Sequence, residues 1–211
     1  MRMKIENIVL DLGGVLLHLD IEESIKRFQE IGVYDARQFL NPYKQSGLFL
    51  DLERGTLSAY EFVRALSQRY GRSYTYNDIE HCLLGFVREA QAYKFEFIEQ
   101  HLLPHYNLYL LSNNNPFIYN WCNSNSFLPD RRKLEGFFHK TFCSYHMNLC
   151  KPEAEIFQAA IDISGMDPEK TLFVDDGEAN VEMGKKFGFR TIMPHNGADW
   201  RNELLSILHR Q

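Results

Sequence analysis

Short apolar runs that stop at polar residues divide the chain and predict buried strands. Three such runs cover residues 8–10, 108–111 and 172–174, and each is followed by acidic, hydroxyl or amide side chains. Apolar runs of this length with polar breaks are typical of parallel strands that are buried on both faces of a sheet. Two further strands are expected at residues 140–144 and 190–193.

Between residues 18 and 90 the apolar positions recur at helical spacing, without the alternation that a strand would show. One of the helices expected there begins with Ser58 followed three residues later by Glu61, which is a capping-box pattern. Another has two candidate caps, Asn77 and Asp78. The three predicted helices cover residues 22–32, 56–70 and 77–86.

After about residue 91, strands and helices alternate. The helices expected in this part lie before Pro104, around Trp121, after Pro152, over residues 177–188 and from about Asp199. This alternation predicts the α/β class, with a Rossmann-like parallel sheet that carries helices on both faces. Residues 1–17 and 91–211 form the predicted core domain, and residues 18–90 form a small all-helical domain inserted into it.

Polar side chains follow three of the predicted strands at the point where each strand ends. Asp11 follows the first, Ser112 and Asn113 follow the second, and Asp175 and Asp176 follow the third. In an open α/β sheet, ligands bind at the carboxyl ends of the strands. Neighbouring carboxylates repel each other when buried, and a hard divalent cation with a preference for oxygen ligands removes that conflict.

Lys151 stands directly before Pro152, where an apolar-periodic segment predicts the first position of a helix. An ammonium group there can neutralise a phosphate and a carboxylate nucleophile. Acids that hold a cation, polar groups that hold phosphate oxygens and a carboxylate that attacks phosphorus together suit phosphoryl transfer. Plain structural alternatives are helix caps, turns and solvated charges, and they apply to Asp11, Asp175, Ser112, Asn113 and Lys151.

Four motifs, taken in order, resemble those of the haloacid dehalogenase (HAD) superfamily. They are Asp11-Leu12-Gly13-Gly14-Val15, Ser112-Asn113, Lys151-Pro152-Glu153 with Ile156-Phe157, and Asp175-Asp176 with Asn180. The resemblance covers nearly the whole chain. Within the superfamily, the chain resembles glucose-1-phosphate phosphatase-like members. This resemblance implies the HAD fold, with the helical insert as a cap over the active site. It also implies a Mg²⁺-dependent phosphatase that works through an aspartyl-phosphate on a small phosphorylated metabolite such as a sugar phosphate.

The resemblance further implies a role for each motif residue. The catalytic residues are Asp11, as the nucleophile, and Lys151. The metal site comprises Asp11, the backbone carbonyl of Gly13, Asp176 as a direct ligand and Asp175 through a water molecule. The phosphate contacts are Ser112, Asn113, Asn114 and Lys151, while Asn180 supports the acidic loop.

One position departs from the family pattern, because Gly13 stands where a second aspartate usually serves as the general acid and base. Such help is worth roughly 100- to 10,000-fold in rate. Either another group supplies the proton, or the substrate has a good leaving group, or the protein hydrolyses nothing. His18 and Asp20 lie near the expected hinge of the cap and are candidate replacements. Arg54 is a candidate substrate contact, with a solvated side chain or a local ion pair as the alternatives.

Two rival functions stay open at this stage. A 2-haloacid dehalogenase uses the same nucleophile without a metal, although it has less use for the pair Asp175-Asp176. A non-catalytic protein that binds a phosphorylated metabolite would explain Gly13. Loss of activity with a chelator separates the first rival from a phosphatase, and Mg²⁺-dependent phosphate binding without turnover identifies the second.

Composition limits the remaining possibilities. A net charge of −5 disfavours nucleic acid and anionic membranes as main partners. No stretch approaches the roughly 18 apolar residues of a membrane span, and Glu6 and Asp11 interrupt any signal-peptide core, so a cytoplasmic location is expected. The four cysteines show no paired spacing. Cys143, His146 and Cys150 lie close together, but zinc is disfavoured because no fourth ligand is evident.

Overall fold

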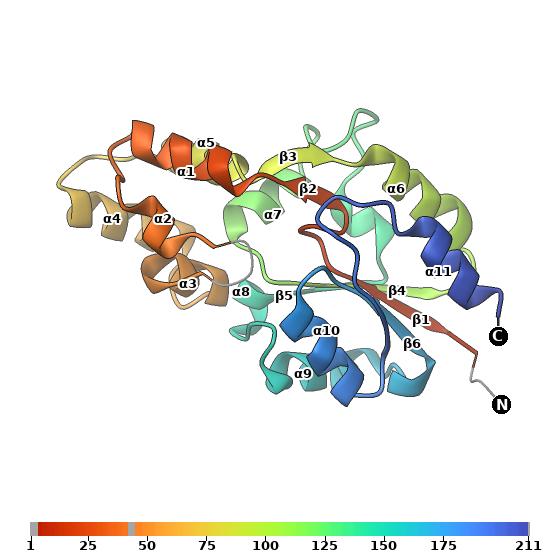
Figure 1. Cartoon of the computed structure of the whole chain (residues 1–211). Helices are drawn as coiled ribbons and strands as arrows, with labels where there is room; N and C mark the ends of the chain where they lie inside the picture. The colour runs from red at the N-terminus through yellow and green to blue at the C-terminus, as the bar shows by residue number, and fades with distance from the viewer. Residues whose placement is uncertain (1–3, 42–44, 211) are drawn as a thin grey trace.

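The computed structural model describes residues 4–41 and 45–210. At its centre lies a five-stranded parallel sheet with the order β5-β4-β1-β6-β7 (Figure 1). The chain runs from β1 outward through β4 to β5, and then returns to the other side of β1 for β6 and β7. The strand order therefore reverses beside β1, which is the position where ligands bind in open α/β sheets. The strands are β1 (Asn7–Leu10), β4 (Asn107–Ser112), β5 (Lys140–Cys143), β6 (Thr171–Val174) and β7 (Arg190–Ile192).

Both faces of the sheet are buried, because alternate residues of β1, β4 and β6 enter two different hydrophobic clusters. Ile8 and Leu10 of β1 pack in the larger cluster, and Val9 between them packs in the smaller one. The larger cluster includes side chains of α6 and α11, and the smaller includes side chains of α9. The central strands therefore carry consecutive apolar residues at 8–10, 108–111 and 172–174, which is the pattern from which they were predicted.

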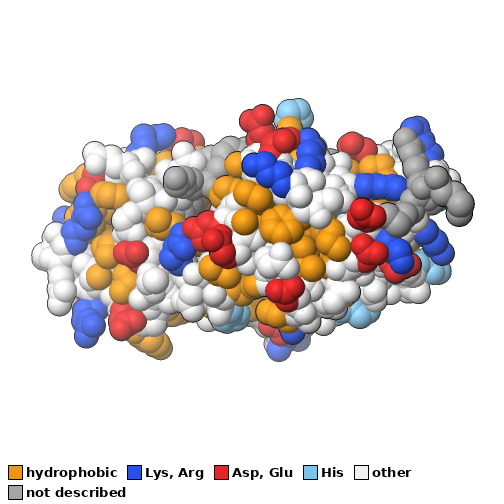
Figure 2. All heavy atoms as spheres, turned by 90° about the horizontal axis from the view of Figure 1, so that it is seen from below, with side chains coloured by type: hydrophobic (Ala, Val, Ile, Leu, Met, Phe, Trp, Pro, Cys, Tyr) orange, Lys and Arg blue, Asp and Glu red, His pale blue; other side chains and the backbone are white. Residues whose placement is uncertain are grey.

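Helices cover the sheet on both sides, as predicted from the alternation along the chain (Figure 1). The core helices are α6 (Ala92–Phe97) with a π-helical continuation (Ile98–Leu102), α7 (Pro116–Cys122), α8 (Ser144–Met147), α9 (Ala154–Ser164), α10 (Glu178–Lys186) and α11 (Arg201–Leu208). Two short 3₁₀ turns, Leu134–Phe137 and Pro168–Lys170, complete the connections. On the face seen in Figure 2, acidic and basic side chains are interspersed among apolar ones.

The helical insert lies to one side of the sheet and consists of α1 (Ile21–Glu30), α2 (Ala36–Phe39), α3 (Gly47–Arg54), α4 (Ala59–Tyr70) and α5 (Tyr76–Leu84). The predicted capping box at Ser58 and Glu61 is present and begins α4. The prediction of Asn77 or Asp78 as the N-cap residue of α5 was wrong. Thr75 is the N-cap residue of this helix, and Asp78 is its capping-box partner. Neither α2 nor α3 was predicted, since both are too short to show a clear helical period.

The two ends of the insert form a structure that the apolar pattern did not reveal. β2 (Leu17–Leu19) and β3 (Val87–Ala90) pair as an antiparallel two-stranded ribbon. The partners are about 70 positions apart in the chain, and strands of three and four residues carry too little alternation to be recognised. The segment 18–90 is thus helical between its ends but enters and leaves the core through a short ribbon.

Pro152 does not occupy the first position of a helix, which corrects the prediction. α9 begins at Ala154 with Glu153 as its N-cap residue, and the bond between Lys151 and Pro152 is cis. The side chain of Asn113 holds the Lys151 backbone through two hydrogen bonds. The helix starts only after this contact, at Ala154. Among the residues that the structure describes, no helix has the length and apolar composition needed to cross a membrane.

Candidate active site

The polar residues predicted at the strand ends meet at one edge of the sheet. Asp11 follows β1 directly, and Asp175 and Asp176 follow the neighbouring strand β6. Ser112 is the last residue of β4, the other neighbour of β1. Because parallel strands end at the same edge, Asp11 and Asp175 lie close together although they are more than 160 positions apart in the chain.

Three carboxylates form the centre of this site. Asp11, Asp175 and Asp176 each offer an oxygen within 4.8 Å of the others. In the described part of the chain, they are the one group of acidic, histidine or cysteine side chains arranged closely enough to share a metal ion. Cys143, His146 and Cys150 form no such group, and the His146 ring instead contacts Tyr145 and Tyr119.

Lys151 lies between two of these acids. Its Nζ is 3.1 Å from an oxygen of Asp11 and 2.5 Å from an oxygen of Asp175, and its side chain is 1% exposed. Burial lowers the pKa of the Lys151 ammonium, but the two carboxylates raise it more, so the pKa lies above its ordinary value. Lys151 is therefore a cation at neutral pH, and its charge is directed at the predicted nucleophile.

The remaining negative charge makes the site suitable for a divalent cation. Burial, together with the neighbouring carboxylates of Asp11 and Asp175, raises the pKa of Asp176 to about 7. Burial also raises the pKa of Asp11, against the opposing effect of Lys151. The ionised carboxylates of Asp11 and Asp176 therefore have too little positive charge near them. The ligand atoms that these side chains offer are oxygens, the hard ligands that Mg²⁺ prefers.

Asp175 and Asp176 differ in their surroundings. Asp175 is fully buried, and its carboxylate accepts hydrogen bonds from the Gly177 N–H at 2.8 Å and from Asn180 Nδ2 at 3.0 Å, besides the contact with Lys151. Asn180 therefore supports the acidic loop as predicted. Asp176 is only partly buried and lines the cavity described below. Asp176 is therefore the more accessible of the two carboxylates from the cavity.

Glycine is required beside the acids for a steric reason. Gly14 has φ +70°, and a Cβ placed on it would lie 2.0 Å from Oδ2 of Asp176. Any side chain at this position would displace that carboxylate, and most residues would also be strained in the left-handed conformation. At Gly13, a Cβ would lie 3.0 Å from Cδ1 of Leu19, so a leucine from β2 packs against the position of the missing carboxylate.

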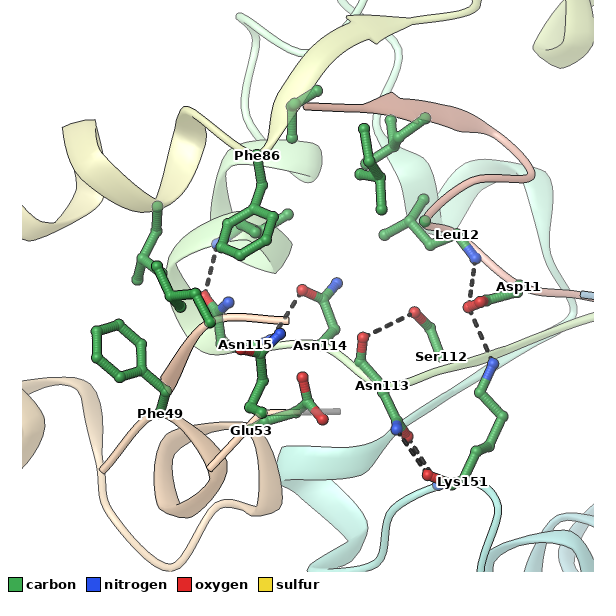
Figure 3. Close-up of a pocket in the computed structure, with 18 of the residues that line it drawn as sticks. Asp11, Leu12, Phe49, Glu53, Phe86, Ser112, Asn113, Asn114, Asn115 and Lys151 are labelled. Carbon is green, nitrogen blue, oxygen red and sulfur yellow. Dashed lines mark hydrogen bonds and ion pairs between the residues drawn. The ribbon is translucent and has the colours of Figure 1, made fainter. Parts of the chain in front are cut away.

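Asn113 fixes the third motif to the second. Its Nδ2 donates to the Lys151 carbonyl at 2.9 Å, while the Lys151 N–H donates to Asn113 Oδ1 at 2.8 Å. Ser112 is buried, with its Oγ 3.4 Å from the Asn113 carbonyl. The side-chain amide of Asn113 is thus engaged with the backbone at Lys151, which positions the lysine and leaves Ser112 facing the cavity (Figure 3).

Asn114 has the clearest unmet hydrogen-bonding capacity. Its Oδ1 accepts from the Asn115 N–H at 2.8 Å, but its buried Nδ2 has no partner within the described residues. Asn114 is 5% exposed and lines the cavity. A buried N–H group without a partner costs about 1–3 kcal/mol, so a ligand oxygen at this point would be stabilised.

The cavity lies between the strand ends and the helical insert (Figure 3). Its polar floor contains the residues described above, and its far wall comes from the insert and the ribbon. That wall is mostly apolar, with Leu19, Leu40, Phe49, Leu52, Leu83, Phe86 and Val87. Two polar side chains interrupt it, Gln45 and Glu53. The sequence analysis singled out Arg54 but not its neighbour Glu53, which lies in a helix that was not predicted.

Three other predicted candidates do not reach the cavity. Asp20 caps α1 by accepting from the Glu23 N–H at 3.2 Å, and His18 packs against Gly197. Neither lines the cavity, so neither replaces the missing acid there. Arg54 forms an ion pair with Glu153 of the third motif, which corresponds to the ion-pair alternative rather than to a substrate contact.

Comparisons with known proteins agree with this geometry. A family model described as haloacid dehalogenase-like hydrolase matches residues 5–188. A D-ribitol-5-phosphate phosphatase of Bacteroides thetaiotaomicron is 42% identical over 205 residues, which are 97% of this chain and 99% of that protein. A predicted HAD-like family hydrolase from Porphyromonas gingivalis has a solved structure with 47% identity and a TM-score of 0.95, covering 99% of this chain and all of that one. A HAD family enzyme from B. thetaiotaomicron, solved in complex with magnesium and inorganic phosphate, has 34% identity and a TM-score of 0.87, covering 94% and 98%.

Proposed function

The chain belongs to the haloacid dehalogenase-like hydrolase family, and we propose that its substrate is the phosphate ester of a short polyol or sugar. It is a magnesium-dependent phosphatase that acts on a small phosphorylated metabolite. The observation that carries this function is the meeting of three carboxylates with the buried ammonium of Lys151 at the ends of β1 and β6. Carboxylates alone suit a cation, and the added ammonium suits a phosphate bound beside it.

Asp11, the backbone carbonyl of Gly13 and Asp176 would hold Mg²⁺, with Asp175 acting through a water molecule. The cation would neutralise charge on the phosphoryl oxygens when bound. The ion pair of Asp175 with Lys151 and its bonds from Gly177 and Asn180 support the indirect role, because they already occupy its oxygens.

Asp11 would attack phosphorus and form an aspartyl-phosphate, which water then hydrolyses. Its position supports this role, because two groups orient its carboxylate at the carboxyl end of β1. The Leu12 N–H donates to Asp11 Oδ1 at 2.7 Å, and Lys151 forms an ion pair with the same oxygen. Lys151, Ser112 and the unpartnered Nδ2 of Asn114 would stabilise the phosphoryl oxygens. Asn113 would act through Lys151, whose backbone it holds.

The insert offers two polar side chains to a substrate. Gln45 and Glu53 are the polar residues of the insert that line the cavity, and its other lining residues are apolar. The relative that is 42% identical over almost its whole length is a D-ribitol-5-phosphate phosphatase, so five-carbon polyol and sugar phosphates are the first compounds to test. The insert would serve as the cap, with core and cap divided near residues 17 and 91, and its closure would exclude water from the reaction.

A cytoplasmic location belongs to the same proposal. All four cysteines are free and buried, as expected for a protein kept in a reducing compartment.

The test is turnover of D-ribitol 5-phosphate, other pentose and hexose phosphates and 2-haloacids, with Mg²⁺ and with EDTA. We expect phosphate release from one or more esters, its loss in EDTA and a decrease of at least about 1,000-fold in Asp11→Asn. Asp20→Asn is the matched control, because Asp20 caps a helix outside the cavity. Turnover of a haloacid in EDTA would identify a dehalogenase instead. Mg²⁺-dependent phosphate binding without turnover would identify a binding protein.

A further inference from the structure

The reaction needs a proton donor that the first motif does not supply. Gly13 has no side chain, and Leu19 packs at 3.0 Å from the place where a Cβ would begin. An alcohol leaves phosphorus poorly as an alkoxide, so its oxygen needs a proton as the bond to phosphorus breaks. His18 and Asp20 do not line the cavity. The donor must therefore come from elsewhere on the cavity wall.

Glu53 is the acidic residue that the helical insert places in this cavity. Among the residues that line it, the other acids are Asp11 and Asp176 of the metal cluster. Figure 3 shows the Glu53 carboxylate pointing into the cavity from α3, near Asn113 and Asn114 and across from Asp11. Within the described residues, this carboxylate makes no hydrogen bond or ion pair that would engage its oxygens.

The end of α3 is fixed to the core, so Glu53 is held at a defined place. The Glu53 carbonyl lies 2.6 Å from Ser144 Oγ, which also contacts Asn114. The next residue, Arg54, forms an ion pair with Glu153. Gly55 then ends the helix against the Tyr145 backbone so closely that a Cβ would lie 2.1 Å from its carbonyl oxygen.

The side of the cavity that Glu53 occupies is the side that the reaction requires. Attacking and leaving oxygens lie roughly in line through phosphorus, so the leaving oxygen points away from the nucleophile. With Asp11 at the strand ends, the leaving oxygen faces the insert. We propose that Glu53 is the general acid and base of this phosphatase, supplied by the insert in place of a side chain at Gly13.

The proton balance follows from these positions, and it rests on the phosphatase function proposed above. As Asp11 bonds to phosphorus and the ester P–O bond breaks, protonated Glu53 gives its proton to the leaving alkoxide. The Glu53 carboxylate then takes a proton from the water that attacks the aspartyl-phosphate. The bond between phosphorus and Asp11 breaks, the Asp11 carboxylate is restored, and Glu53 is again protonated.

The surroundings of Glu53 suit both halves of this cycle. Burial raises the pKa of Glu53 to about 7, with Lys151 and Arg54 opposing the rise and Asp11 adding to it. An acid whose pKa lies near the working pH is present in both forms and transfers protons efficiently in each direction.

The test compares Glu53→Gln with the wild type on two esters whose leaving groups differ. One is the best sugar or polyol phosphate, and the other is p-nitrophenyl phosphate, whose phenolate leaves without a proton. With the sugar ester, we expect kcat to fall about 100- to 10,000-fold. With p-nitrophenyl phosphate, we expect one equivalent of nitrophenol in a burst near the wild-type rate, followed by slow turnover. Acid-quenched protein should then carry a phosphoryl group on Asp11.

Two controls separate this role from a structural one. Asp51→Asn changes the charge of the same helix outside the cavity and should keep wild-type kinetics with both esters. The thermal midpoint of Glu53→Gln should be equal to or above that of the wild type.

Each other outcome overturns the proposal. Equal losses with both esters and no phosphorylated Asp11 would make Glu53 a binding residue. Wild-type rates in Glu53→Gln would remove it from the reaction. If the wild type itself hydrolyses neither ester, the proposed function fails and this inference fails with it.

Discussion

Charge balance around Lys151 explains how three acids share one edge of the sheet. The carboxylates of Asp11, Asp175 and Asp176 carry three negative charges when ionised, and Lys151 carries one positive charge. The formal sum is −2, which one divalent cation neutralises. Close approach of the acids also depends on Gly14, which leaves room for Asp176.

Gly14→Ala should weaken Mg²⁺ binding by about 10- to 100-fold, because the new methyl group displaces the Asp176 carboxylate. Titration calorimetry with MgCl₂ measures the effect. Gly71→Ala is the matched control, since Gly71 also has a positive φ, +62°, but a Cβ there meets nothing within 4 Å. Both variants should lose about 1 kcal/mol of stability from backbone strain. Equal Mg²⁺ affinity in the two would show that Asp176 is not a ligand.

At the scale of elements, α3 is the segment that links the insert to the site. Its last residues contact the core through Ser144, Tyr145 and Glu153, all of which lie beyond β5. The Arg54–Glu153 ion pair joins the insert directly to the motif that carries Lys151. Movement of the insert would therefore disturb Glu53 and the third motif together.

The Arg54–Glu153 pair should be coupled in catalysis. Arg54→Ala and Glu153→Ala should each lower kcat/KM, and the double variant should lose less than the sum of the two. We expect a coupling free energy of about 0.5–1 kcal/mol, because the side chains are 31% and 35% exposed and solvent screens their charges. Arg37→Ala breaks an exposed pair within the insert and should leave kcat/KM unchanged. Strict additivity in the cycle would show that the pair does not position the site.

At the scale of the whole molecule, the buried Lys94 ties together three segments behind the first motif. It is fully buried on α6, and its Nζ donates to the Val15 carbonyl at 2.6 Å and to the Ala198 carbonyl at 2.7 Å. Trp200 Nε1 donates to the same Val15 carbonyl at 2.9 Å. The loop that follows Asp11 is thereby fixed against the C-terminal part of the chain.

This lysine gives the fold a stability that depends on pH. Burial lowers the pKa of Lys94 from 10.5 to about 8, with Asp199 opposing and Arg201 adding to the decrease. Between about pH 8 and 10.5 the unfolded chain binds more protons than the folded one, so the free energy of unfolding rises with pH. Relative to Lys94→Met, the wild type should gain up to about 2 kcal/mol between pH 8 and 10. Urea denaturation of both proteins at each pH measures this difference, and a constant difference would contradict it.

Local patterns were sufficient for the strands of the parallel sheet and for most of the polar residues that meet at its edge. The interior residues of β1, β4 and β6 form short apolar runs that end in polar groups, so these strands and the side chains after them are visible in the sequence. The capping box of α4 is equally local, since its two partners are three residues apart. The α/β class and the polar residues at the ends of these strands follow from such short-range signals.

Contacts between distant segments were decided only by the tertiary structure. Glu53 lies in a short helix without a clear period, and Arg54 pairs with a residue 99 positions away. The ribbon at the ends of the insert and the carbonyls bound by Lys94 likewise join segments about 70 to 100 positions apart. The identity of a residue does not show which distant residue contacts it in the folded chain. The sequence therefore shows glycine at position 13, where the family pattern has an aspartate, and only the tertiary structure places Glu53 in the same cavity as Asp11 and Asp176.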